Sequence, residues 1–119
     1  MRRTRADPSL RRFASALAEG LHLPQTAGRI VGLLATQGRL SVRQIVARAR
    51  ASERGVRQNL SLLMRKGILE RKVLVTANRK LAYTYSLRSV DELLAAAERE
   101  FSSMVTRLQL FAEKALPGA

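Results

Sequence analysis

Cysteine and tryptophan are absent from this chain, and histidine occurs once. Without cysteine there is no disulfide framework, no thiolate zinc site and no cysteine nucleophile, and one histidine is too few for a multi-histidine metal cluster. The sequence also has no glycine-rich phosphate loop and no pairing of a nucleophile with a base. We therefore expect no metal, no cofactor and no enzymatic activity.

Long apolar runs are missing as well. No stretch approaches the roughly 18 to 20 residues that a membrane span needs, and the arginine-rich start has no apolar region behind it. We expect a cytoplasmic protein without a membrane partner.

Acidic residues are scarce, with 9 Asp and Glu against 22 Lys and Arg and a formal net charge of +13. The excess is concentrated in residues 39–80, which hold twelve basic and two acidic side chains, whereas residues 81–119 hold four and five. A surface of this kind attracts polyanions, so nucleic acid is the first partner to consider. The nearly neutral C-terminal segment must have another role.

Capping residues and apolar spacing predict four helices in the first half of the chain. Pro8 and Pro24 suit the first turns of two helices that end near Gly20 and Gly38. A capping box at Ser41 then predicts a short third helix. Ser52 predicts the N-cap of a fourth helix over 53–66, which Gly67 ends. The third and fourth helices, separated by three residues, form a helix-turn-helix.

Residues 68–75 and 81–87 are rich in β-branched and aromatic side chains, and they flank a polar stretch at 76–80. This pattern predicts a β-hairpin, which would be the wing of a winged helix-turn-helix.

A second capping box at Ser89 begins a long helix that reaches about Ala115. Its apolar residues are spaced alternately four and three apart over more than three heptads, which is typical of a helix that packs lengthwise against another helix. They are Val90, Leu94, Ala97, Phe101, Met104, Leu108, Phe111 and Ala115.

The expected fold is therefore mainly α with a β-hairpin: a winged helix-turn-helix with a long C-terminal dimerisation helix. We divide the chain into a basic disordered arm at 1–6, a DNA-binding domain at 7–88 and a coiled-coil-like dimerisation helix at 89–116. The predicted homodimer interface joins this helix with the first one. It comprises Leu10, Phe13, Leu17, Leu94, Ala97, Phe101, Met104, Leu108 and Phe111.

At 100° per residue, one side of the fourth helix is apolar and the other is cationic and polar. Arginine forks onto guanine and glutamine pairs with adenine, so we assign base reading to Arg54, Arg57 and Gln58. Arg79 and Lys80 at the wing tip are assigned to the minor groove. Phosphate contacts and positioning are assigned to Ser41, Arg43, Ser52, Gly55, Ser61 and Arg65. In an average soluble helix such a face would merely be solvated, but the wing and the charge asymmetry favour DNA here.

Two segments, 23–34 (LPQTAGRIVGLL) and 52–60 (SERGVRQNL), together with Gly67-Ile68-Leu69, resemble the MarR superfamily of winged-helix regulators over roughly residues 10–88. The likeness is greatest to the GbsR-like branch and to small archaeal regulators. The resemblance implies a dimeric transcriptional regulator, usually a repressor, with the recognition-helix positions at Ser52, Arg54, Gly55, Arg57, Gln58 and Ser61 and the wing tip at Arg79. Relatives often carry glycine in the turn where this chain has Arg50, which would either strain a left-handed turn by roughly 1 to 2 kcal/mol or indicate a different turn geometry.

The sequence thus favours a sequence-specific double-stranded DNA-binding regulator of the nucleoid. Two alternatives stay open: a nucleoid-associated protein that coats DNA with little sequence preference, and an RNA-binding winged helix. A small-molecule effector is a further possible partner, but no residue pattern supports it.

Overall fold

The computed structural model describes residues 8–116 and 118, so the basic arm at 1–6 lies outside the described residues. The elements follow the order α1 (Pro8–Gly20), α2 (Gln25–Gln37), β1 (Leu40–Ser41), α3 (Val42–Ala49), α4 (Glu53–Arg65), β2 (Leu69–Val75), β3 (Leu81–Leu87) and α5 (Val90–Ala115). The expected winged helix-turn-helix is confirmed, with helix boundaries within a residue or two of those predicted.

Helices α1 to α4, the start of α5 and a small sheet enclose one apolar core. Ile30 and Val31 of α2, Ile45 of α3 and Leu63 of α4 are fully buried, and Ile68 closes the core at the start of the hairpin. Burying such side chains contributes about 1.5 to 3 kcal/mol each, which holds α2, α3 and α4 in a fixed arrangement. The orientation of α4 therefore depends on this core.

The sheet has three antiparallel strands in the order β1, β3, β2. Leu40 pairs with Tyr85 and Ser41 with Thr84, so a segment expected to be only a short extended link is a strand. This pairing joins the start of α3 to the base of the wing. Ser41 also caps α3: its hydroxyl accepts from the Gln44 backbone N–H at 3.2 Å, and the Gln44 side chain accepts from the Ser41 N–H at 2.9 Å.

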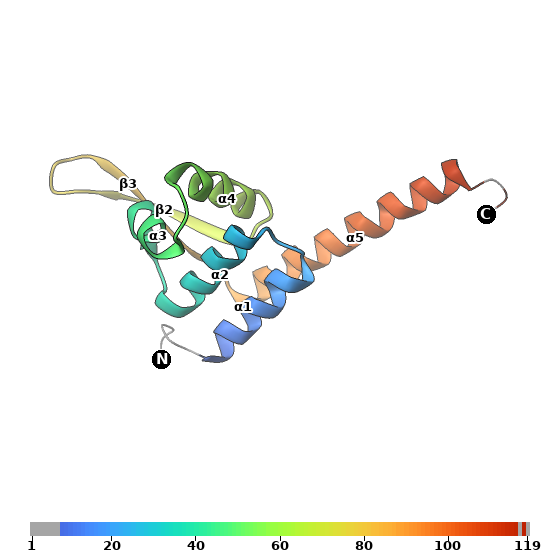
Figure 1. The fold of residues 1–119 in the computed structure, drawn as a ribbon, viewed down its shortest axis with the longest axis horizontal. Helices are drawn as coiled ribbons and strands as arrows, with labels where there is room; N and C mark the ends of the chain where they lie inside the picture. The colour runs from blue at the N-terminus through green and yellow to red at the C-terminus, as the bar shows by residue number, and fades with distance from the viewer. Residues whose placement is uncertain (1–7, 117, 119) are drawn as a thin grey trace.

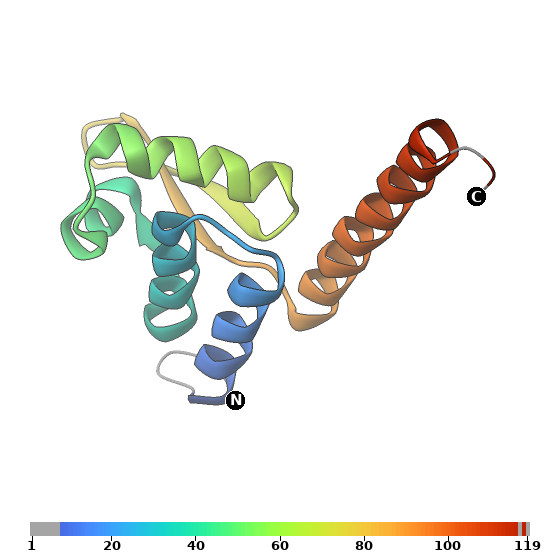
Figure 2. The same cartoon turned by 45° about the vertical axis from the view of Figure 1, so that its right-hand side comes forward.

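Helix α5 runs away from this core, as Figures 1 and 2 show, and the protein extends over 65 × 31 × 24 Å. Its start is fixed by the predicted capping box of Ser89 and Glu92. The pKa of the Glu92 carboxyl is lowered by the hydrogen bond from the Ser89 backbone N–H and then by the Ser89 hydroxyl. No helix within residues 8–116 combines the length and the apolarity that crossing a membrane requires.

Two contacts fix the first turns of α5 against the rest of the chain. Leu93 and Ala96 are buried, and the Lys66 ammonium at the end of α4 pairs with the Glu100 carboxylate at 2.9 Å. The apolar residues with heptad spacing lie beside this buried ridge and are largely exposed. Helix α5 thus has two apolar faces, and only the one with Leu93 and Ala96 is fully buried within its own chain.

The turn between α3 and α4 has the left-handed conformation considered above. Arg50 has φ 54° and ψ 46° and ends α3. We expect Arg50→Gly to raise the free energy of unfolding by about 0.5 to 1 kcal/mol, because glycine adopts this conformation without a steric penalty. Urea unfolding measures the change.

A matched control replaces another arginine of the same region, Arg48 in the last turn of α3. Arg48 is exposed and helical, so Arg48→Gly should lower stability by about 1 kcal/mol. Equal loss of stability in both variants would show that the Arg50 turn carries no strain.

Candidate nucleic-acid interface

The two sides of α4 differ sharply in burial. Val56, Leu60 and Leu63 are buried against the core, at no more than 2% exposure. The cationic and polar residues on the opposite side are all exposed. They are Arg54, Arg57, Gln58, Ser61 and Arg65. The side chains assigned to base reading from the sequence therefore share one solvent-accessible surface, which we call the α4 face, defined by these five residues and Glu53.

The first turn of α4 is tightly built. The Ser52 hydroxyl accepts from the Gly55 N–H at 3.0 Å, and the Asn59 amide donates to the Gly55 carbonyl at 2.8 Å. A Cβ added at Gly55 would lie 3.2 Å from the Ser52 Oγ, closer than most real contacts. Glycine here therefore protects the cap as well as leaving room above the helix start.

Ser41 and Arg43 lie at the start of α3. Arg43 is exposed and Ser41 is half-buried. Because the Ser41 hydroxyl and backbone N–H both serve the α3 cap, the side chain of Arg43 is the freer of the two to meet a phosphate.

The wing tip is closed by hydrogen bonds of its own. The Thr76 N–H donates to the Lys80 carbonyl at 2.9 Å, the Lys80 N–H donates to the Thr76 hydroxyl at 3.1 Å, and Arg79 has a positive φ of 59°. Arg79 and Lys80 are exposed at this tip. In Figure 1 the wing projects from the core at the end opposite to α5.

Arg71 was not predicted as a site residue. Its guanidinium lies 4.5 Å from the centre of the Tyr83 ring, in the geometry of a cation–π pair. Both side chains line a groove between α4 and the wing, together with Arg57, Ser61 and Arg65. The hairpin register could have identified Arg71. Val73 pairs with Tyr83, and Arg71, two residues before Val73, lies on the same face of the ribbon.

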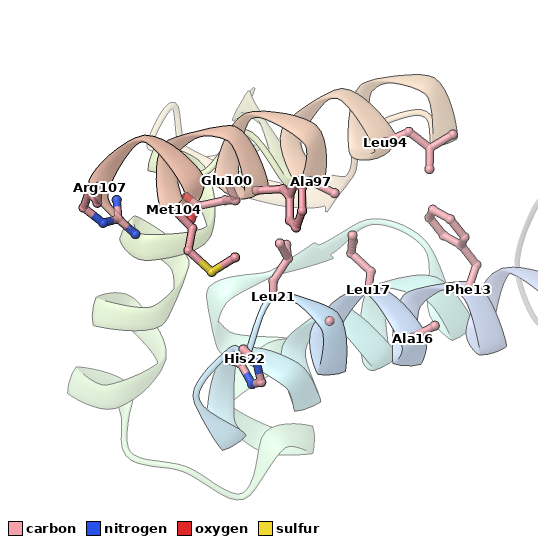
Figure 3. A pocket seen from close by; sticks show the side chains of 12 residues that line it. Phe13, Ala16, Leu17, Leu21, His22, Leu94, Ala97, Glu100, Met104 and Arg107 are labelled. Atoms are coloured by element: carbon pink, nitrogen blue, oxygen red, sulfur yellow. The ribbon is translucent and has the colours of Figure 1, made fainter. Parts of the chain in front are cut away.

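A second groove lies between α1 and α5, far from the wing. Figure 3 shows Leu94 and Ala97 of α5 opposite Phe13 and Leu17 of α1, with Met104 reaching into the space between the helices. Its lining is mainly apolar, and Glu100 and Arg107 are its charged members.

The predicted dimer residues differ in how much surface they leave free. Phe101, Leu108 and Phe111 are 59 to 66% exposed, and Leu94 and Met104 are 51% and 42% exposed. Leu10, Phe13 and Ala97 are partly buried against the core. Leu17 is only 8% exposed, so its own chain already covers most of it. Among residues 8–116 and 118, no three His, Asp or Glu side chains are grouped so as to hold a metal ion.

Comparison with known proteins places this geometry among helix-turn-helix proteins. Residues 14–70 match the family described as the RNA polymerase III subunit RPC82 helix-turn-helix domain. The comparison with curated proteins yields no match.

Solved structures give a fuller match. A possible transcriptional regulator from Methanosarcina mazei Go1 aligns with a TM-score of 0.67 at 14% identity, covering 83% of this chain and 84% of that one. A second transcriptional regulator aligns with a TM-score of 0.59 at 29% identity, covering 92% and 74%. A MarR family transcription regulator aligns with a TM-score of 0.48 at 22% identity, covering 90% and 70%. By its fold the chain is a winged helix-turn-helix protein.

Proposed function

We propose that this protein is a dimeric, sequence-specific transcriptional regulator that binds double-stranded DNA and acts as a repressor by occupying a promoter. The observation that carries the proposal is the α4 face: three arginines, a glutamine and a serine stand exposed on a helix whose other side is buried. The similarity to a transcriptional regulator at 29% identity supports it.

In this proposal α4 lies in the major groove. Arg54, Arg57 and Gln58 are in the N-terminal half of α4, the part of a recognition helix that meets base edges. Ser61 and Arg65 follow towards the C-terminal end and are assigned to phosphates, with Ser41, Arg43, Ser52 and Gly55 positioning the flanking backbone. Arg79 and Lys80 of the wing tip at 76–80 enter the minor groove.

A second copy of the chain is the proposed occupant of the exposed apolar face of α5. Isolated apolar side chains on a surface are ordinary, but here Leu94, Phe101, Met104, Leu108 and Phe111 repeat along one side of a helix that leaves the core. Residues 81–119 hold four basic and five acidic side chains, so two such segments can approach without strong repulsion. We assign 7–88 to DNA binding and 89–116 to dimerisation.

A two-fold dimer would place two α4 helices in successive major grooves, with half-sites about 10 base pairs apart. Selection of bound duplexes from a random pool tests specificity, symmetry and spacing together. An enriched palindrome with this spacing is the expected result, and a footprint without two-fold symmetry would contradict the dimeric arrangement.

A nucleoid-associated protein with little sequence preference is the second candidate, and the net charge of +13 favours it. Phosphate contacts raise affinity for every sequence. Competition with bulk genomic DNA separates the two functions, because a specific regulator keeps its operator whereas a coating protein is titrated away.

A further inference from the structure

The α4 face contains a single carboxylate, that of Glu53, in the first turn of the helix. We propose that Glu53 is a positioning residue that sets DNA sequence specificity: it holds the Arg57 guanidinium for base reading and restrains it from phosphates. This inference rests on the proposed function and adds to it a residue that opposes binding to arbitrary duplexes.

The geometry is a single charge-assisted hydrogen bond. The Arg57 Nε donates to the Glu53 Oε2 at 2.9 Å, across one turn of α4. Because the bond uses Nε, the two terminal amino groups of the guanidinium keep their donors for another partner. Those groups can donate in parallel to O6 and N7 of guanine. Glu53 therefore orients the Arg57 fork without occupying it.

The ion pair between Glu53 and Arg57 contributes little to the stability of the fold. The side chains of Arg57 and Glu53 are 59% and 64% exposed, and ion pairs in water contribute little to folding. A carboxylate on a surface that meets a polyanion also opposes binding through like-charge repulsion. Every other charged side chain of α4 is an arginine, so Glu53 acts against the field that its neighbours create.

Specificity is a difference between two affinities, and weakening the wrong complex raises it as effectively as strengthening the right one. On an arbitrary duplex, a free arginine would turn to the nearest phosphate and add affinity that carries no sequence information. Tied to Glu53, Arg57 gains less from phosphates. On the correct site it gains its full base contact, because its terminal amino groups are already available.

The test is Glu53→Gln, which keeps the shape of the side chain and removes its charge. Dissociation constants are measured for a duplex selected by the wild-type protein and for a random-sequence duplex, over a range of salt concentrations. We expect affinity for the random duplex to rise about 3- to 10-fold and affinity for the selected duplex to change less, so that their ratio falls. The salt slope on the random duplex should steepen by about 0.9 per bound protomer, because each freed Arg57 neutralises one more phosphate.

Two controls separate this role from a change in net charge. Glu113→Gln makes the same charge change on the exposed part of α5 and should leave the ratio unaltered. In an Arg57→Ala background, Glu53→Gln should no longer lower the ratio, since its effect on specificity passes through Arg57.

A ratio unchanged by Glu53→Gln, or lowered equally by Glu113→Gln, would overturn the inference while the proposed function stands. A fall in the ratio that persists without Arg57 would also overturn it. Wild-type protein that binds no duplex would overturn the proposed function and this inference with it.

Discussion

Replacing Phe101 with glutamate is expected to convert the protein into a monomer and to remove most of its affinity for operator DNA. Phe101 lies midway along the exposed apolar face of α5, is 64% exposed and also lines the groove between α1 and α5. Against a second copy, a carboxylate there would be buried among apolar side chains without a partner, which is strongly unfavourable. Sedimentation measures the association state.

The loss of DNA affinity follows from linkage between two half-sites. In a dimer the second α4 binds at a high effective concentration, and such linkage raises affinity by about 10² to 10⁴ over a single site. The Phe101→Glu monomer should therefore bind a full operator about as weakly as it binds a single half-site. A monomer that binds the operator tightly would contradict the dimeric arrangement.

Ser103 offers the matched control. It is exposed, it lies about 200° around α5 from Phe101, and its hydroxyl accepts from Arg107 at 2.8 Å. Ser103→Glu introduces the same charge away from the apolar face, where it can pair with Arg107. We expect this variant to remain a dimer and to bind as the wild-type protein does.

Much of the fold could be predicted because its boundaries are set by local chemistry. Ser41, Ser52 and Ser89 each stand at a helix start with a backbone N–H within reach of the hydroxyl, and the structure places an N-cap at all three. A cap requires only neighbours within four residues, so sequence spacing is sufficient to find it. The hairpin followed in the same way from β-forming side chains around a polar tip.

What escaped prediction depends on contacts between distant segments. The strand at Leu40 exists only because Tyr85 pairs with it, and no local pattern in two residues announces a strand. In α5 the heptad spacing identified one apolar face correctly, but burial within the chain falls on Leu93 and Ala96, outside that spacing. The direction in which α5 leaves the core determines which of its faces is buried, and that direction depends on contacts with distant segments.

In the candidate site, too, some features follow from local sequence patterns and others do not. Helical periodicity placed the α4 face, because the buried side of an amphipathic helix determines its exposed side. The pairing of Arg71 with Tyr83 needed the hairpin register, and the pairing of Arg57 with Glu53 depends on which rotamers the two side chains adopt. Base reading itself stays a prediction, and DNA-binding measurements test it.

Replacing Arg57 with alanine should relax sequence preference at one base position in each half-site. A good bidentate contact discriminates against the wrong base by about 1 to 3 kcal/mol, so affinity for the selected operator should fall by roughly 5- to 150-fold per half-site contact. Affinity for random duplex should change little, because Glu53 restrains Arg57 from phosphates in the wild-type protein. Binding to a set of operators with every base at each position measures the preference.

Lys80→Ala is the comparison variant that separates loss of base reading in Arg57→Ala from loss of charge. Lys80 is exposed at the wing tip, where a lysine acts as a point charge towards phosphate and the minor groove. Its loss should weaken binding to all sequences about equally and reduce the salt slope by about 1 per bound protomer. If Arg57→Ala instead reproduced this uniform loss, α4 would be binding DNA through charge alone. The coating function would then account for the exposed arginines better than base reading does.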